Sequence, residues 1–162
     1  MLHGNAIGTG HGTGRLNAIH GYGAWFAQTN EAGQWWQMDL GSPKQVIGVV
    51  TQGRHYHSSQ YVSSYTVNVS SNGFGWSQVD GGHVFTGNDA TNDAKVWSRF
   101  ATQVQARYVR IVVQTWNSHI SMRAGLWLQK DENITAASTY LQDCSDCPPG
   151  EHPLSCRSQA TL

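Results

Sequence analysis

The chain has 162 residues, with 10 Lys and Arg, 10 Asp and Glu, and no net charge when His is neutral. Only 12% of the residues are charged, about half the usual share, whereas aromatic residues, including seven Trp and six Tyr, make up 10%. This composition excludes a disordered charged tail and gives no electrostatic footprint for nucleic acid, and the sequence has no apolar stretch long enough for a transmembrane helix.

The charge balance changes sign near residue 130. Residues 1–130 have a net charge of +4 and contain all seven Trp, whereas residues 131–162 have a net charge of −4 and contain all three Cys. We therefore predict one domain over 1–130, followed by an acidic tail or the truncated start of a small Cys-rich module over 131–162. Cys144, Cys147 and Cys156 cannot all pair within the chain, and a disulfide module is favoured over zinc because a zinc site needs about four ligands.

Predicted strands account for most of the first 130 residues. Period-two alternation and β-branched runs predict strands, in chain order, over 34–40, 45–52, 61–70, 96–100, 107–114 and 121–128. The glycines of 8–14 lack a preceding strand and a following helix, so they predict a surface loop rather than a phosphate-binding loop. Asn72-Gly73 suits a tight hairpin turn. The predicted fold class is an all-β, antiparallel sandwich or barrel.

The alternation also predicts which side chains face the core. These are Trp36, Met38 and Leu40, then Tyr65, Val67 and Val69, and finally Val109, Ile111 and Val113. Asp39 alternates with the first group, and we expect it to pair with Arg107, Arg110 or Arg123 rather than to act as a catalytic base.

Blocks of residues in a fixed order carry a family resemblance. They include Arg15-Leu16-Asn17, Gly23-Ala24-Trp25, the run from Gln34 to Gly41, Ala106-Arg107-Tyr108-Val109-Arg110-Ile111, and the run from Thr115 to Arg123. Over about residues 15–128 the chain resembles the discoidin domain, also called the coagulation factor five/eight type C domain. The resemblance implies a distorted jelly-roll β-barrel that binds galactose-type sugars, anionic phospholipid surfaces or proteins such as collagen through loops at one end. It also implies a module that is rarely catalytic.

The sequence departs from the family pattern at the positions of its cysteines. The family usually begins with a Cys and a strand well before the Arg-Leu-Asn block, but only fourteen residues precede Arg15 here. The usual closing Cys is absent, and Phe26 stands where many members have a Cys. The disulfide that commonly joins the termini is therefore missing, which leaves open whether the barrel has its first strand or an open sheet edge.

By block order, the family's binding loops correspond to residues 4–14, 18–23 and 54–60. Their aromatic and polar side chains suit a sugar better than a bilayer, because a pyranose stacks on a ring and pairs its hydroxyls with planar donors. The predicted ligand-binding residues are Tyr22, Asn30, Arg54, His55, Tyr56, His57 and Gln60. A structural role stays open for three of these residues. Arg54 could instead pair with a loop carboxylate at the end of its strand, and Tyr22 and Tyr56 could be ordinary loop aromatics packed on the barrel.

Two metal hypotheses follow from the loops. Asn88, Asp89 and Asp93 offer hard oxygen ligands for Ca²⁺, although a hydrated turn explains this segment equally well. His55 and His57 would need a third ligand to form a transition-metal site, from His3, His11 or His20. We expect no other cofactor, and we expect His119 to be structural.

The sequence therefore predicts a non-catalytic module for carbohydrate recognition in cell adhesion or extracellular matrix attachment. Too few well-placed carboxylates and the lack of a Gly-x-Ser-x-Gly elbow disfavour a hydrolase. The alternatives are an anionic phospholipid surface or a collagen-like protein as ligand of the same loops. Because one shallow sugar site binds weakly, we expect multivalency through oligomers or tandem domains.

Extracellular or cell-surface localisation is expected. The sequons at Asn68 and Asn133 fit an extracellular protein. The first residues lack a basic start and an apolar core, so they do not form a signal peptide. We therefore expect the chain to be a fragment of a longer protein, with a cytoplasmic location as the alternative.

Overall fold

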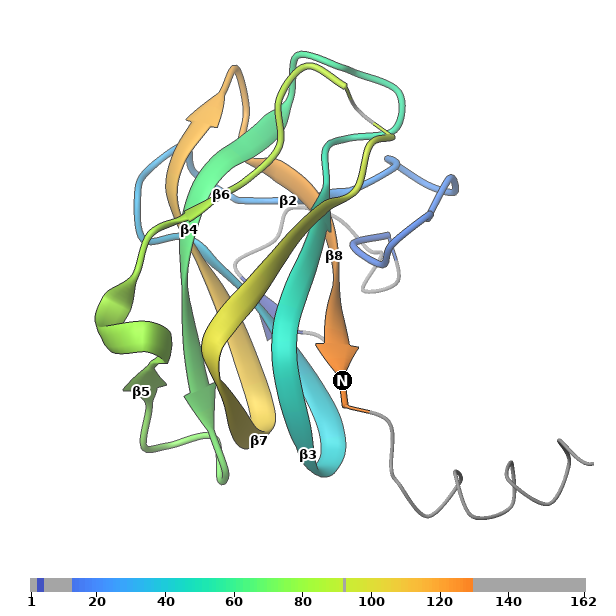
Figure 1. The fold of residues 1–162 in the computed structure, drawn as a ribbon. Helices are drawn as coiled ribbons and strands as arrows, with labels where there is room; N and C mark the ends of the chain where they lie inside the picture. Colours follow the sequence, from blue (N-terminus) through green and yellow to red (C-terminus); the bar gives the residue numbers. More distant parts are fainter. Residues whose placement is uncertain (1–2, 5–12, 92, 130–162) are drawn as a thin grey trace, which may run out of the picture. The chain divides into compact units, whose positions relative to one another are not determined.

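A computed structural model of the chain describes residues 3–4, 13–91 and 93–129, which belong to one compact unit (Figure 1). The predicted tail 131–162 lies outside the described residues, as does most of the predicted loop 4–14. Within the described part, no helix is long and apolar enough to cross a membrane.

The described residues form eight strands whose mutual pairings are all antiparallel. They are β1 (His3–Gly4), β2 (Trp25–Phe26), β3 (Trp35–Gln52), β4 (Tyr61–Ser70), β5 (Ser77–Gln78), β6 (Phe85–Thr86), β7 (Val96–Asn117) and β8 (Ser121–Leu128), with one 3-10 turn, η1 (Val79–Gly82), between β5 and β6. The predicted all-β class is confirmed, and β4 and β8 have the predicted bounds.

The two longest strands each replace a pair of predicted strands. β3 runs through Gly41-Ser42-Pro43, which separates the predicted strands 34–40 and 45–52, and its pairing with β7 shifts register between Asp39 and Lys44. Gly41 adopts a φ of 76°, and the exposed bend around it reverses the strand. Because β7 bends beside β3, the hydrogen-bonded ladder continues around the corner (Figure 1).

The bends fold one continuous sheet into two packed layers. The first layer contains the N-terminal half of β3, the C-terminal half of β7, β4 and β5. The second contains the C-terminal half of β3 between the N-terminal half of β7 and β8, with β2 at its edge. At the edge of the first layer, β1 pairs with β3 through His3↔Gln37 and Gly4↔Trp36.

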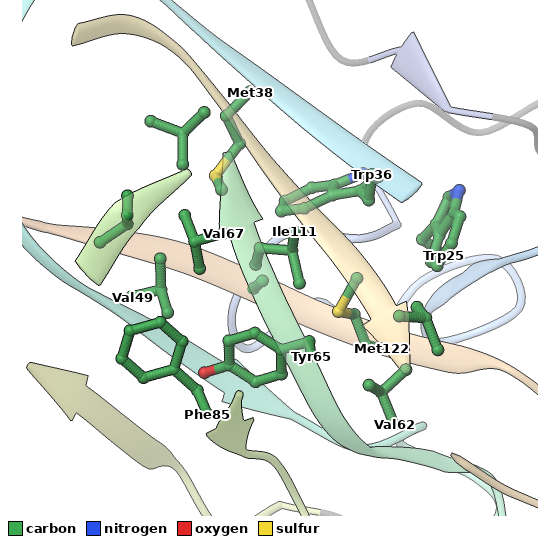
Figure 2. Packing of buried hydrophobic residues seen from close by; sticks show 14 of the residues in the cluster. Trp25, Trp36, Met38, Val49, Val62, Tyr65, Val67, Phe85, Ile111 and Met122 are labelled. Atoms are coloured by element: carbon green, nitrogen blue, oxygen red, sulfur yellow. The ribbon is translucent and has the colours of Figure 1, made fainter. Parts of the chain in front are cut away.

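The core lies between these layers (Figure 2). Tyr65 of β4 is fully buried, stacks on Phe85 with ring centroids 5.9 Å apart, and donates a hydrogen bond to Ser98 Oγ over 3.0 Å. This bond crosses from one layer to the other, and burial raises the pKa of Tyr65. All nine positions predicted to face the core lie in it or pack against it.

Asp39 pairs with a framework arginine, as predicted. Arg107 Nε donates to Asp39 Oδ1 over 2.9 Å, and Nη2 donates to Oδ2 over 3.1 Å. The backbone N–H of Gly41 also donates to Oδ1, over 2.8 Å. These bonds, led by that from Arg107, lower the pKa of Asp39 to about 2. The carboxylate therefore stabilises the bend of β3.

The hairpin between β4 and β5 is longer than predicted. Its last pair is Val69↔Ser77, so the connection is not the tight turn expected at Asn72-Gly73. The Asn72 side-chain oxygen accepts hydrogen bonds from the N–H groups of Phe74 and Gly75 instead, over 2.9 and 3.1 Å. This side-chain turn replaces the backbone turn that Asn-Gly usually forms.

Candidate functional site

Two of the three predicted binding loops, 18–23 and 54–60, meet at the end of the barrel opposite the bends of β3 and β7 (Figure 1). Loop 54–60 connects β3 to β4. Loop 18–23 lies beside it, because the His55 N–H donates a hydrogen bond to the Gly23 carbonyl oxygen over 3.1 Å. The two loops therefore form one surface.

An aromatic and polar cluster occupies this surface. We call it the Phe26 cluster and define it as Tyr22, Phe26, Arg54, Gln60 and His119. The Tyr22 and His119 rings both meet Phe26 edge-on, with centroid distances of 5.8 and 5.9 Å. The guanidinium carbon of Arg54 lies 4.5 Å from the centre of the Phe26 ring, within the range of a cation–π contact. Phe26 thus joins two binding loops to the turn between β7 and β8.

Arg54 is held in this cluster by two further contacts. Its Nε donates to the Tyr22 carbonyl oxygen over 3.1 Å, and its Nη1 donates to Gln60 Oε1 over 2.7 Å. Burial lowers the pKa of Arg54, but a guanidinium remains protonated in proteins. Its partners are uncharged oxygens, not the carboxylate of our alternative interpretation. Among the described residues its guanidinium makes no further hydrogen bond, so side-chain donors remain for a ligand.

The two predicted tyrosines have different environments. Both rings are well exposed, 61% for Tyr22 and 58% for Tyr56. The Tyr56 hydroxyl donates to the Ile19 carbonyl oxygen, and its ring packs edge-on against His55 with centroids 4.6 Å apart. Gly23 allows this approach, because a Cβ there would lie 3.0 Å from Tyr56 Cδ2. Tyr56 is therefore fixed by the neighbouring loop, while Tyr22 contacts only Phe26 through its ring among the described aromatic pairs.

A second group of side chains lies at the same end of the barrel. We call it the Asp93 junction, formed by His55, Asp93 and Arg123. Arg123 is 1% exposed and donates to the carbonyl oxygens of Gly53 and Ala18, over 2.8 and 3.4 Å. Its Nη2 donates to Asp93 Oδ1 over 2.9 Å, and His55 Nδ1 lies 3.0 Å from the same oxygen. These contacts, His55 first and Arg123 second, lower the pKa of Asp93.

Three of the predicted ligand-binding residues lie outside both groups: Tyr56, described above, Asn30 and His57. The Asn30 side chain accepts a hydrogen bond from the Ile120 N–H over 2.9 Å and donates to the Ser118 carbonyl oxygen over 3.4 Å. It thereby fixes the turn that carries His119. His57 is exposed at the loop surface, and its backbone N–H donates to the Arg54 carbonyl oxygen over 3.4 Å.

The predicted calcium ligands all make contacts within the protein, although the buried Asn88 Oδ1 has no hydrogen-bond partner among the described residues. The buried Asn88 amide donates to the carbonyl oxygens of Thr51 and Ala94, over 3.3 and 3.1 Å. Asp89 accepts hydrogen bonds from the N–H and hydroxyl of Thr91, which lower its pKa, and Asp93 belongs to the junction described above. Within the described ranges, three His, Cys, Asp or Glu side chains do not come together as a metal site would require. Calcium binding stays a prediction.

The structure thus brings together three predicted residues, Tyr22, Arg54 and Gln60. Sequence reasoning missed Phe26 as their common support, although its signal was present: in a strand, the neighbour of a buried Trp25 faces outward. It also missed Asp93 and Arg123 as the residues that join the loops. The resulting surface offers an exposed ring beside a fixed guanidinium, which suits recognition of a small polar molecule with one apolar face.

Comparison with known proteins gives matches over the whole barrel. The family model described as the F5/8 type C domain matches residues 4–126. Lactadherin of Bos taurus is 41% identical over 118 residues, covering 69% of this chain and 27% of that protein. Coagulation factor V of Homo sapiens is 35% identical over 121 residues, covering 70% of this chain and 5% of that protein. The chain thus spans a small part of these relatives.

Solved structures share the fold at lower sequence identity. Discoidin II from Dictyostelium discoideum superposes with a TM-score of 0.74 at 24% identity, over 81% of this chain and 55% of the other. A family 32 carbohydrate-binding module from Clostridium perfringens, in complex with GalNAc-β-1,3-galactose, gives a TM-score of 0.56 at 13% identity, over 76% of this chain and 88% of the other.

Proposed function

The chain belongs to the F5/8 type C, or discoidin, domain family, and from this premise we propose that it is a non-catalytic module that binds a galactose-type carbohydrate at the Phe26 cluster. The family match and the structural likenesses confirm the resemblance and the jelly-roll fold expected from the sequence. The ligand, its site and its biological setting are the proposal.

One observation carries this proposal: the exposed Tyr22 ring and the Arg54 guanidinium, which the protein already holds in place, both contact the Phe26 ring. Arg54 is fixed by Phe26, by Gln60 and by the Tyr22 backbone, so little side-chain entropy is lost when it binds a ligand. Its remaining donors would pair with neighbouring hydroxyls, while the apolar face of a pyranose stacks on Tyr22. A solved module of this fold is in complex with GalNAc-β-1,3-galactose, which supports a sugar as the ligand.

The same loops also support the alternatives. Ile19 is 49% exposed next to the two tyrosines, and the residues up to Lys130 carry a +4 balance, which would favour an anionic phospholipid surface. A collagen-like protein is the other alternative. We favour a sugar because the aromatic tips are tyrosines, whose hydroxyls are costly to bury in a bilayer.

We further propose that the module acts outside the cell in adhesion or matrix attachment, that it acts in several copies, and that it requires no catalytic group. One exposed sugar site gives weak affinity, and linkage of copies multiplies it. Binding with and without EDTA tests whether Asn88, Asp89 and Asp93 contribute a calcium site that the ligand needs.

The test is titration of the protein with methyl β-galactoside and with a glycan array, using Arg54→Ala, Arg54→Lys and Tyr22→Ala. We expect Arg54→Ala to weaken binding about tenfold or more, because charged hydrogen bonds contribute roughly 1.5–3 kcal/mol each. Arg54→Lys keeps the charge but loses the fork, so it rescues little. Tyr22→Ala is expected to weaken binding about fivefold through lost stacking.

Phe74→Ala serves as the matched control, because Phe74 is 90% exposed in the β4–β5 connection and lies outside the binding loops. Sugar binding that survives Arg54→Ala would contradict the proposed site. Salt-sensitive binding to phosphatidylserine vesicles without any sugar binding would favour the lipid alternative. Loss of binding to collagen upon Arg54→Ala, with no effect of sugars, would favour the protein alternative.

A further inference from the structure

An exposed tryptophan stands on the outer surface of the second layer, away from the Phe26 cluster. Trp97 of β7 is 58% exposed, whereas the other six tryptophans, all within the described residues, are buried or half-buried. A strand tryptophan with most of its indole in water is costly to leave uncovered. It therefore marks a surface with a binding role.

The residues around Trp97 form one continuous part of the outer face of the second layer. Val50 follows the core residue Val49 in β3, so its side chain lies on the outer face of the sheet. It pairs with Trp97 of β7 on one side and with Gly125 of β8 on the other. Val50 is nevertheless only 1% exposed, so side chains on that face cover it. The Trp127 indole stands perpendicular to that of Trp97, at 82° with centroids 5.5 Å apart. We call this surface the Trp97 face.

Gly48 of the neighbouring strand β3 adds no side chain to this face. Gly48 pairs with Arg99 on one side and with Trp127 on the other, and a Cβ at Gly48 would lie 2.4 Å from the Ser98 carbonyl oxygen. With no side chain between them, the indole of Trp127 and the guanidinium of Arg99 lie over β3 from opposite sides. The carbon at the centre of the guanidinium is 5.6 Å from the Trp127 ring.

The charged groups of the Trp97 face are cations. Trp97 and Arg99 are two residues apart on one strand, so their side chains point to the same face about 6.6–6.8 Å apart. Lys95, exposed just before β7, adds a second cation. Asp93 is paired with Arg123 in the junction, and Asp80 accepts a hydrogen bond from the Ala101 N–H at 2.9 Å.

We propose that the Trp97 face is a second binding site, for an acidic polysaccharide. A sugar ring stacks on Trp97, and its carboxylate or sulfate pairs with Arg99, with Lys95 neutralising the next charge along the chain. The spacing of ring and cation matches one sugar ring and its substituent. Two exposed cations along one segment suit an extended charged polymer better than a small ligand. This site is independent of the neutral-sugar site proposed at the Phe26 cluster.

The experiment measures binding of the full chain to polygalacturonate oligomers and to the same oligomers after complete methyl esterification. The esterified chain keeps the sugar rings and removes their charge, so we expect it to bind at least about tenfold more weakly, and we expect the acidic form to dissociate as salt is raised. A parallel titration with heparin separates recognition of sulfate from recognition of carboxylate. Equal binding of the acidic and esterified chains would overturn the proposal.

Variants place the binding on this face. We expect Trp97→Ala and Arg99→Gln each to weaken polygalacturonate binding about fivefold, and Trp97→Tyr to keep most of it. Arg99→Gln and Trp97→Tyr keep the test decisive if Trp97→Ala unfolds. Phe74→Ala and Arg54→Ala are the controls, and both should bind polygalacturonate as the parent does.

Two results would refute the assignment while leaving the Phe26 cluster unaffected. One is loss of polygalacturonate binding in Arg54→Ala with full binding in Trp97→Ala, which would place the acidic sugar at the barrel end. The other is binding of phosphatidylserine vesicles, but not polysaccharides, in a Trp97-dependent way. Failure of galactoside binding alone would refute only the site at the Phe26 cluster.

Discussion

The Phe26 cluster and the Asp93 junction lie at the same end of the barrel and both contain an arginine, but the two arginines differ in what remains for a ligand. Arg54 is half-buried, rests on an aromatic ring and donates to two uncharged oxygens. Arg123 is almost fully buried and donates to two carbonyl oxygens and a carboxylate. Arg54 is therefore fixed but still accessible to a ligand, whereas the hydrogen-bond donors of Arg123 bind groups of the protein itself.

This difference suggests that the Phe26 cluster binds the ligand, whereas the Asp93 junction holds the loops in position. The junction connects β8 to Ala18, the first residue of loop 18–23, and to Gly53, which precedes loop 54–60. It also connects β8 to the segment before β7. Gln52 adds to it, because its amide donates to the Asp93 carbonyl oxygen over 2.8 Å and its Oε1 accepts from the Asn17 N–H, also over 2.8 Å. Changes at the junction should therefore alter stability first, and changes at the Phe26 cluster should alter binding first.

The largest effect on stability is expected for Arg123→Met. Methionine keeps much of the apolar stem but leaves the Gly53 and Ala18 carbonyl oxygens without their donor. We expect the free energy of unfolding, measured by urea denaturation, to fall by about 3 kcal/mol. Arg99→Met is the matched control, because Arg99 is exposed, and it should change stability by less than about 0.5 kcal/mol. Equal losses in the two variants would refute the role given to the junction.

A smaller effect is expected for Gly23→Ala, which probes the contact between the two loops. Gly23 has a φ of 70°, and the new Cβ would lie 3.0 Å from Tyr56 Cδ2 and 3.1 Å from His55 Cβ. We expect a loss of about 1–2 kcal/mol in the free energy of unfolding.

Two other glycines separate the causes of this loss. Gly33 has a φ of 90° with open space around it, so Gly33→Ala reports backbone strain alone. Gly75 has open space and no positive φ, so Gly75→Ala should be close to neutral. If Gly23→Ala were no more destabilising than Gly33→Ala, the packing of Tyr56 against loop 18–23 would contribute nothing to stability.

Strands were predictable where the sequence alternates without interruption. β4 and β8 have their predicted bounds because turn-forming or polar residues flank a clean period of two. β3 and β7 were each predicted as two strands, and in β3 the reason is that Gly41-Ser42-Pro43 has the composition of a turn. What continues β3 through that segment is its pairing with β7, a long-range contact that no local pattern encodes.

The site was predictable only as a set of loops. The order of the family's sequence blocks predicted that Tyr22, Arg54 and Gln60 lie in loops at one end of the barrel. In the structure, Arg54 donates hydrogen bonds to both Tyr22 and Gln60. It did not indicate that Asn30 would fix a turn, or that Asp93, considered only as a calcium ligand, would pair with Arg123. Such contacts depend on how separate loops fold against each other, so residue type alone does not specify them.

The smallest expected effect concerns the pH dependence of the junction. The pKa of Asp93 is lowered in the folded state, so its contribution to stability is fully present above the unfolded value near 3.9 and is lost as the pH falls through the lower folded value. In Asp93→Asn this contribution is absent at every pH. The difference in unfolding free energy between parent and variant should therefore shrink as the pH falls below about 4.

The effect should be modest, because the Asp93 side chain is 58% exposed and water screens its charge. Asp39, with a pKa of about 2, titrates in both proteins and cancels from the difference. Glu31→Gln, which changes an exposed carboxylate, should give a difference that does not vary with pH in this way. If the difference for Asp93→Asn stays constant from pH 6 to pH 2, then its carboxylate charge does not stabilise the junction, and the loops are held by Arg123 and the backbone carbonyl oxygens alone.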